Sequence, residues 1–450
     1  MAEAISPGSV ADGHAAVIGG SVAGLLAARV LADHYGRVTV LERDALPEEA
    51  APRKGVPQGR HTHAMLSRGA AIVEGLFPGF IDEMVEHGGV QAVFSQDGAF
   101  VAQGRPIRQF SSDMRTFAAT RPLTEERLRE RVRALPNVDI VEDCDALGPI
   151  ASSDNSRITA LRVRHRGDAD QEERIEADLV VDASGRGSRS PKWLEELGYA
   201  PPAEERLEVD VRYMTRFFKR EPRQMNGRLF VVITARPDNP RVGIATSVEG
   251  DRWMVTLCGY AGDQAPADEA GYREFAASLA APDIAQLLEE VEPCSDPIPA
   301  GYPANQWRHY EKLKEWPDGY LVFGDAMCSL NPLYGQGMSV SAMEATLLQE
   351  NLQRNGEPNA RQFFRDASKA IEGPWMVATG GDLDLPVLEG RRPPMVRVMN
   401  AYFRRVMFTA SRDEVVSQRL SDVINLECPP TVLLNPRTVS RVLAGSVRGG

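Results

Sequence analysis

Three small residues near the start of the chain, Gly19, Ser21 and Gly24, have the spacing of a G-x-G-x-x-G turn. Gly19 permits a tight turn out of a strand, Gly20 follows it, and Gly24 lets the next helix pack closely. Beyond the turn, a helix N-terminus presents free N–H groups and partial positive charge. This combination predicts a binding site for the pyrophosphate of a dinucleotide.

A carboxylate, Glu42, follows about 20 residues after the turn. At the end of a second strand it can accept hydrogen bonds from a ribose, and it would repel a 2′-phosphate, so FAD or NAD fits and NADP does not. Ser21 replaces the usual second glycine, but a hydroxyl donated to a charged oxygen returns about 1.5–3 kcal/mol. The alternative is a buried strand–helix–strand unit without a ligand.

These residues need a strand, a helix and a second strand to position them. The apolar run 15–18 is typical of a buried strand, an alanine- and leucine-rich helix follows, and the second strand ends at Glu42. Together they predict the opening βαβ unit of a Rossmann-like domain in an α/β protein. We expect a strand over 319–323 to return to this domain and residues 1–13 to form a disordered leader.

The middle of the chain has the pattern of an antiparallel sheet. From Leu207 to Phe217 apolar and polar residues alternate, and only Met214 breaks the polar face, which is typical of a half-exposed strand. Further strands are predicted over 229–234, 242–248 and 252–258, the last two joined by a hairpin at 249–251. We expect this sheet to be the wall of a substrate site.

The chain therefore divides into three predicted parts. They are a discontinuous dinucleotide-binding domain (1–90, 117–200 and 300–355), a substrate domain (91–116 and 201–299) and a helical C-terminal region (356–450). Smaller expectations are a single helix over 67–87, a helix over 121–135 with mostly solvated arginines, a proline-rich connector over 293–303, and loose final residues.

Composition limits the function. A net charge of −12 argues against nucleic acid or an anionic membrane as the main partner. There is no uncharged apolar run long enough for a transmembrane helix and no basic N-terminal segment typical of a signal peptide. Five scattered cysteines suit a reducing compartment, so we expect a cytoplasmic protein.

A polar connection after Glu42 carries several basic residues, which could flank a bound cofactor. They are Arg53, Lys54, Arg60, His61 and His63. The two histidines lie two residues apart, which is not the spacing of metal ligands on a helix. A structural role is favoured for them, and no metal site is expected.

Three landmarks stand in the order shown by single-component FAD-dependent monooxygenases of the para-hydroxybenzoate hydroxylase superfamily. They are the glycine turn with Glu42, a strand and turn at Asp182, and Gly324-Asp325 followed by a proline–glycine loop and a helix. The chain resembles this superfamily over about its first 350 residues. Three stretches, RKGVPQGRHTH, LVVDASGRGS and GDAMCSLNPLYGQGMS, most resemble bacterial epoxidases that oxidise polyene chains in polyether biosynthesis.

The resemblance implies a role for individual residues. The pyrophosphate of FAD would be lined by the glycine turn, its adenosine ribose held by Glu42, and its adenosine and phosphate region approached by Arg43, Arg60 and Arg121. Gly324 and Asp325 would bind the ribityl chain or pyrophosphate, and the loop with Pro332, Gly335, Gly337 and Met338 would wrap the pyrimidine edge of the isoalloxazine. A helix beginning near Met338 would also stabilise an anionic reduced flavin by about 0.3–1 kcal/mol.

The chain also departs from related families. Aromatic hydroxylases usually have an asparagine, a glycine and an Asp-Ala pair where this chain has Ser339, Ser341 and Glu344-Ala345. The W-x-W-x-I-P motif of flavin halogenases is absent, which argues against halogenation. Geranylgeranyl reductases are more distant relatives with a similar FAD domain.

The resemblance implies a reaction carried out by the cofactor. NADPH or NADH, bound transiently, or a separate flavin reductase would reduce FAD, and O₂ would then form a C4a-hydroperoxide. One oxygen atom would pass to a lipophilic small molecule of secondary metabolism, by alkene epoxidation or by hydroxylation. No catalytic acid or base is assigned, because this transfer needs no side-chain nucleophile. The alternatives are a double-bond reductase of the geranylgeranyl reductase kind and a non-catalytic flavin-binding redox partner.

Overall fold

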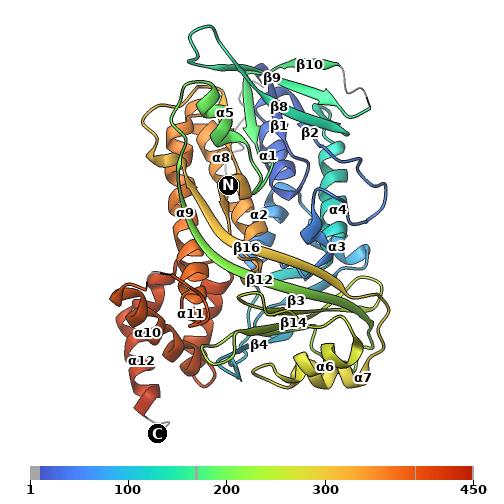
Figure 1. Cartoon of the computed structure of the whole chain (residues 1–450), viewed down its shortest axis with the longest axis vertical. Helices are drawn as coiled ribbons and strands as arrows, with labels where there is room; N and C mark the ends of the chain where they lie inside the picture. The colour runs from blue at the N-terminus through green and yellow to red at the C-terminus, as the bar shows by residue number, and fades with distance from the viewer. Residues whose placement is uncertain (1–10, 168–170, 391, 448–450) are drawn as a thin grey trace, which may run out of the picture.

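The computed structural model describes residues 11–167, 171–390 and 392–447 (Figure 1). Its first sheet is parallel, with the order β17–β11–β1–β2–β7. The strands are β17 (Tyr320–Val322), β11 (Leu179–Asp182), β1 (Ala11–Ile18), β2 (Tyr35–Leu41) and β7 (Val138–Val141). Because β1 begins at Ala11, the end of the predicted leader is strand, while residues 1–10 lie outside the described part.

The glycine turn leads from β1 into α1 (Val22–Ala32), as the spacing predicts. Gly19 has φ +106°, a conformation that side chains disfavour. A Cβ on Gly24 would lie 1.8 Å from the carbonyl oxygen of Gly19, so this position requires glycine. The predicted α/β class with a Rossmann-like domain is confirmed.

A second, mixed sheet of eight strands runs below the first, and its two longest strands cross the middle of the molecule (Figure 1). In order, its strands are β18 (Cys328–Ser329), β16 (Ile298–His309), β12 (Ala203–Lys219), β15 (Arg252–Gly259), β14 (Arg241–Val248), β13 (Phe230–Ile233), β4 (Gly98–Ala102) and β5 (Arg105–Pro106). The predicted proline-rich connector is wrong from residue 298 onward. There β16 pairs with β12; Pro299 is the second residue of the strand, and Pro303 lies at an irregularity of the pairing with β12, where proline is tolerated.

Each face of this sheet packs against a different part of the chain. One face, with Met214 and Phe218 of β12, is buried beneath α6 (Glu269–Ala277) and α7 (Asp283–Glu290). The other face carries Val211 and Tyr213. The prediction of a half-exposed strand therefore fails for the second half of β12, where Met214 belongs to an apolar core.

Two helical predictions also change. The expected helix over 67–87 is two helices, α2 (Ser67–Leu76) and α3 (Phe80–Glu86), because Pro78 and a left-handed Gly79 separate them. In α4 (Arg121–Arg133) the predicted solvated arginine face is wrong. Arg129 is 2% exposed and donates to the carbonyl oxygen of Pro47, at 2.8 Å.

The C-terminal region is helical, as expected, and its last three helices lie at the lower left of Figure 1, below α9. Its helices are α9 (Ala360–Asp382), α10 (Pro394–Ala410), α11 (Glu414–Ile424) and α12 (Pro436–Val447), and they follow α8 (Gly337–Asn355) of the preceding part. The prediction that the final residues are loose is wrong as far as Val447, where α12 ends. Residues 448–450 lie outside the described part. The remaining elements are small: β3 (Val90–Val93), β6 (Arg115–Ala118), β8 (Cys144–Ala151), β9 (Ile158–His165), β10 (Glu172–Glu176) and α5 (Ser190–Glu196).

In the parts of the chain described, no helix combines the length and apolar character needed to span a membrane. The boundaries between the three predicted parts stay a prediction.

Candidate functional site

The glycine turns predicted to bind a cofactor meet at one place. A Cβ on Gly324, in the 3-10 turn η4 (Gly324–Ala326), would lie 2.8 Å from the Cβ of Ala23 in the first turn of α1. A Cβ on Gly337, at the start of α8, would lie 3.7 Å from Oδ1 of Asp325. Gly19 also adjoins the turn after β11, because its Cβ would lie 2.6 Å from the carbonyl oxygen of Ala183.

Beside the turn, five charged side chains and one serine are connected by hydrogen bonds and ion pairs. This set, here called the phosphate-turn cluster, consists of Ser21, Glu42, Asp44, Arg53, Arg121 and Glu125. Ser21 donates to Glu125 at 2.5 Å and accepts from Arg121 at 2.8 Å. Arg121 also pairs with Glu125 at 2.7 Å. The predicted cofactor residues Ser21 and Arg121 are therefore brought together by an acid that the sequence analysis missed.

Arg53 is the centre of this cluster. Its guanidinium pairs with Glu42 at 2.9 Å, with Glu125 at 3.1 Å and with Asp44 at 3.4 Å. Glu42 also accepts from the backbone N–H of Gly20 at 2.9 Å, so it supports the glycine turn directly. The Nη2 atom of Arg53 is buried and has no partner among the described residues, which leaves a donor for a bound anion.

The cluster explains the charge state of Glu125. Burial opposes its ionisation, but the guanidiniums of Arg121 and Arg53 and the hydroxyl of Ser21 outweigh burial, so its pKa lies below the ordinary value. Glu125 is recognisable from sequence only as an acid four residues after Arg121 on the same helix. Two other predicted residues, Arg43 and Arg60, are exposed, and Arg43 reaches the edge of the cluster through an ion pair of 3.9 Å with Asp44.

Asp325 is half-buried, and in the described chain its carboxylate has no hydrogen-bond or ion-pair partner. Burial raises its pKa above the ordinary value, and the nearby charges of Arg121 and Arg186 only partly offset this. A carboxylate held in this way at the start of α8 has its acceptor positions available to a ligand hydroxyl.

The loop predicted to wrap the isoalloxazine forms the turn η5 (Pro332–Tyr334) and the start of α8. Gly335 has φ +66°, and a Cβ there would lie 3.3 Å from the Cβ of Ala64, so the loop packs against the connection after β2. Gly337 and Met338 form the first turn of α8, next to Asp325.

Glu344, one of the departures from the aromatic hydroxylases, supports the Gly324 turn. It is fully buried on α8, and its Oε2 accepts from the backbone N–H of Gly324 at 2.6 Å. Its Oε1 has no partner in the described chain. Burial raises the pKa of Glu344 to about 8, and the charge of Asp325 adds to the rise.

A second buried polar group lies between the large sheet and this loop, at the end of α9. Asp382, the last residue of α9, accepts from Asn305 at 2.7 Å, Tyr260 at 2.9 Å, Tyr334 at 3.0 Å and Asn331 at 3.1 Å. Around it lie apolar side chains of the large sheet, together with two leucines that follow α9: Val209, Val211, Val242, Leu385 and Leu388.

His61 joins the connection after β2 to the same sheet. Its Nδ1 lies 2.8 Å from the hydroxyl of Thr215, which in turn lies 2.7 Å from that of Thr256. Burial lowers the pKa of His61 to about 4, so the ring is neutral at physiological pH. These contacts describe a structural role, and the described residues hold no group of three or more potential metal ligands.

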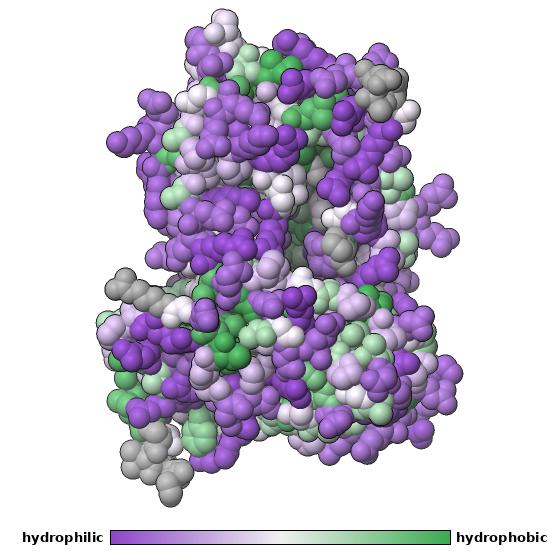
Figure 2. Space-filling model, in the orientation of Figure 1, coloured by the Kyte–Doolittle hydropathy of each residue, from purple (hydrophilic) through white to green (hydrophobic). Residues whose placement is uncertain are grey.

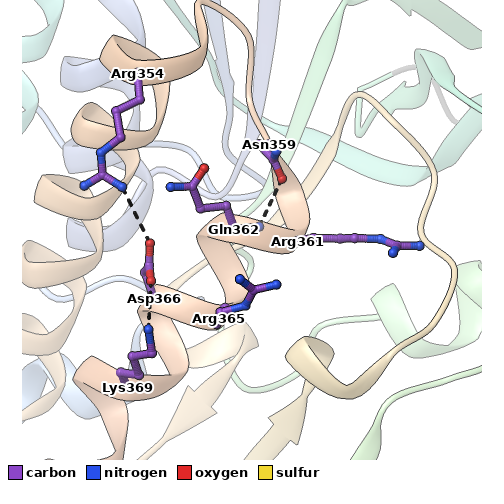
Figure 3. Close-up of a pocket in the computed structure, with 7 residues that line it drawn as sticks. All are labelled: Arg354, Asn359, Arg361, Gln362, Arg365, Asp366 and Lys369. Atoms are coloured by element: carbon purple, nitrogen blue, oxygen red, sulfur yellow. Dashed lines mark hydrogen bonds and ion pairs between the residues drawn. The ribbon is translucent and has the colours of Figure 1, made fainter.

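The surface has a hollow and a separate cavity, which lie at different places relative to the predicted cofactor residues. Figure 2 shows a hollow on this face above β16, over the region where α1 and α2 lie in Figure 1. A cavity of about 470 Å³ lies elsewhere, between the end of α8 and the start of α9 (Figure 3). Arg354 and Lys369 of its lining pair with Asp366, and the cavity contains none of the predicted cofactor residues.

Comparison with known proteins agrees with this geometry. Residues 12–355 match the family described as FAD binding domain, and the chain belongs to that family. It is 32% identical over 449 residues to protein Rv3254 of Mycobacterium tuberculosis, covering 96% of this chain and 94% of that protein.

Solved structures show that the fold is that of flavin-dependent monooxygenases and halogenases. The flavin-dependent brominase Bmp2 matches with a TM-score of 0.69 and 11% identity, covering 97% of this chain and 98% of that one. The p-nitrophenol 4-monooxygenase PnpA of Pseudomonas putida matches with a TM-score of 0.64 and 16% identity, covering 92% and 98%. At these identities the likeness concerns the fold alone.

The residues present fit FAD. The side chain of Ser21, at the N-cap of α1, makes no capping hydrogen bond, and the first turn of the helix holds no acidic residue, so its N–H groups suit a phosphate. Among the described residues, the Nη2 atom of Arg53 is a buried donor without a partner, and the carboxylate of Asp325 is an acceptor without one.

Replacing Asp325 by alanine is expected to weaken FAD binding ten- to a hundredfold, because a hydrogen bond to a charged group is worth about 1.5–3 kcal/mol. The apo protein should keep its thermal stability, since the carboxylate has no partner in the described chain. Fluorescence titration of the apo protein with FAD measures the first effect and a melting curve the second. Asp139→Ala, at an exposed position on β7, is the control, and an unchanged FAD affinity for Asp325→Ala would show that this turn has been misassigned.

Proposed function

We propose that the protein is an FAD-dependent monooxygenase that transfers one atom of O₂ to a lipophilic small molecule, with alkene epoxidation favoured over ring hydroxylation. The observation that carries the substrate class is the apolar face of the large sheet, with Val209, Val211 and Val242. Leu333 of the loop predicted to wrap the flavin packs against this face, so the loop has an apolar support, and a chain-like apolar substrate would lie on the flavin side of it.

The proposed roles of the cofactor residues follow the geometry. The turn Gly19–Gly24 and the N-terminus of α1 would hold the pyrophosphate, with Arg53 and Arg121 supplying positive charge. Glu42 would face the adenosine ribose, although Gly20, Asp44 and Arg53 already donate to its oxygens. Asp325 would bind the ribityl chain.

Two groups of predicted cofactor residues remain to be assigned: those of the loop that begins at Pro332, and the exposed Arg43 and Arg60. Pro332, Gly335, Gly337 and Met338 would surround the pyrimidine edge of the ring, and Arg43 and Arg60 would approach the adenosine from the surface.

Bound FAD would supply the oxygen-transfer chemistry, with electrons from NADPH, NADH or a separate flavin reductase. The protein's own task is to orient the substrate and to exclude water. The tyrosines Tyr213, Tyr260 and Tyr302 suit this task, because their rings are buried in the apolar cluster of the large sheet and exclude water there. Five unpaired cysteines support a reducing compartment, and we propose the cytoplasm.

Incubation under ¹⁸O₂ with chemically reduced FAD tests the reaction. Farnesol serves as a trisubstituted alkene probe and a long-chain alkylphenol as a ring probe. We expect mass spectrometry to show a product that gains one ¹⁸O atom, with more conversion of the alkene than of the phenol. A product that gains two hydrogens without label would assign the protein to the double-bond reductases. Substrate-independent formation of H₂O₂ alone would favour a non-catalytic redox partner.

A further inference from the structure

The carboxylate of Asp382 is buried at the junction of the C-terminal region, the large sheet and the flavin-facing loop. Its side chain is 0% exposed, and four side chains donate to it. Tyr260 comes from β15, Asn305 from β16, and Asn331 and Tyr334 from the loop at η5. One residue at the end of α9 therefore connects three parts of the chain that are distant in sequence.

Two of these donors define the conformation of the loop. Asn331 donates to Asp382 and accepts from the backbone N–H of Leu333 at 3.2 Å, so its amide forms the cap of η5. The backbone N–H of Asn331 donates to Asn305 at 2.6 Å. The hydroxyl of Tyr334 reaches Asp382 past Gly381, where a Cβ would lie 2.3 Å from that hydroxyl.

The loop continues directly into the first turn of α8. Gly335 has a left-handed conformation immediately after Tyr334, and Gly337 begins the helix beside Asp325. A displacement of Tyr334 or Asn331 would therefore move the backbone that faces the ring of the cofactor. This chain of contacts runs from Asp382 to the proposed flavin site without touching the cofactor itself.

We propose that Asp382 is a positioning residue of the active site, which holds the loop 331–334 and the start of α8 in the conformation that receives the isoalloxazine. The proposal rests on the proposed binding of FAD at this loop. It gives the C-terminal region, for which the sequence offered no motif, a defined part in the site.

The charges around Asp382 favour this role. All four hydrogen bonds are donated to it, which suits an ionised carboxylate. Burial raises the pKa of Asp382 to about 6, and these hydrogen bonds limit the rise. The titratable groups that face it are Tyr260 and Tyr334, which are neutral at physiological pH, and burial raises the pKa of each further. Tyr213 lies one contact further, on Asn331, and its pKa is also raised by burial.

Protonation of Asp382 would disturb the set of donors, because a protonated carboxyl oxygen must donate in turn. Asp384, two residues further on, pairs with Arg404 instead and has no hydrogen bond to the loop among the described residues. Asp384→Asn is therefore a matched control, because it removes the same charge from the same end of α9.

The test uses the full-length protein with FAD, in the absence of O₂ and substrate. Asp382→Asn should weaken FAD binding about tenfold and shift the visible absorption bands of the bound flavin. In the wild type, FAD affinity should fall as the pH drops through about 6, and in Asp382→Asn this step should be lost, which leaves only the dependence that Asp325 contributes. Asp384→Asn should match the wild type in affinity, spectrum and pH profile.

A folded Asp382→Asn protein with wild-type FAD affinity and an unchanged pH profile would overturn the proposal. If that variant does not fold, Tyr334→Phe decides, because it removes one donor and keeps the ring. It should shift the flavin bands and weaken FAD binding several-fold, and wild-type values would overturn the proposal. None of these measurements requires oxygen transfer, so a negative ¹⁸O₂ experiment would not affect the proposal for Asp382. A wild-type protein that binds no FAD would instead refute the proposed function.

Discussion

Replacing Arg53 by alanine is expected to lower the free energy of unfolding by about 3–5 kcal/mol, the usual effect of breaking a buried ion pair. The substitution leaves the carboxylates of Glu42, Asp44 and Glu125 buried without their shared guanidinium. Each of these side chains is at most 6% exposed, so water compensates poorly. A loss of this size is a large part of the 5–15 kcal/mol by which proteins of ordinary stability are folded.

Chemical denaturation of the apo protein measures the Arg53→Ala effect. Lys54→Ala, at the exposed neighbouring position, should change the stability by less than about 0.5 kcal/mol. The loss of stability in Arg53→Lys should lie between the losses in Arg53→Ala and Lys54→Ala, because a single ammonium cannot bind three carboxylates as a guanidinium does. Adding Glu125→Gln to Arg53→Ala should restore part of the loss. A loss below about 1 kcal/mol for Arg53→Ala would place the cluster among ordinary surface ion pairs.

Replacing Glu344 by glutamine is expected to change how stability depends on pH. The pKa of Glu344 is raised from 4.5 to about 8 in the folded protein, mainly by burial. The folded state therefore holds a proton that the unfolded state releases. The stability that this proton contributes is complete below pH 4.5 and is lost as the pH rises to about 8.

Glutamine cannot ionise, so the variant should lack this loss. Relative to the wild type, the unfolding free energy of Glu344→Gln should rise by about 1.4 kcal/mol per pH unit between pH 4.5 and 8, and then level off. Denaturation curves at several pH values measure the difference. Glu350→Gln, at an exposed position on the same helix, should run parallel to the wild type. A constant difference between Glu344→Gln and the wild type would mean that Glu344 is ionised in the folded protein.

Local rules explain why part of the site could be predicted from sequence. The turn of Gly19 and Gly24 depends on backbone conformation and close packing within one βαβ unit, which the spacing of small residues records. The Gly324-Asp325 turn and Gly335 are similarly local, because each glycine is required by its own left-handed backbone. The family match over residues 12–355 covers these positions.

The errors have local causes as well. Alternation cannot tell which strands are buried on both faces, so Met214 looked like a break in a polar face rather than part of a core beneath α6 and α7. The arginines of α4 looked solvated because their charge suggests exposure, whereas Arg129 is buried against Pro47, far away in the sequence. Prolines near the start of β16 hid a strand that pairing with β12 stabilises.

By itself, then, the sequence determined the α/β class and the glycine turns, because each depends on neighbours within a few turns of chain. Only the tertiary structure decided which charges meet. Arg53 and Glu125 are 72 positions apart, and Asp382 and Asn331 are 51 apart. Neither pair has a spacing rule. A buried charge is stable only where folding provides its partner, so these contacts are properties of the folded chain and not of any one segment.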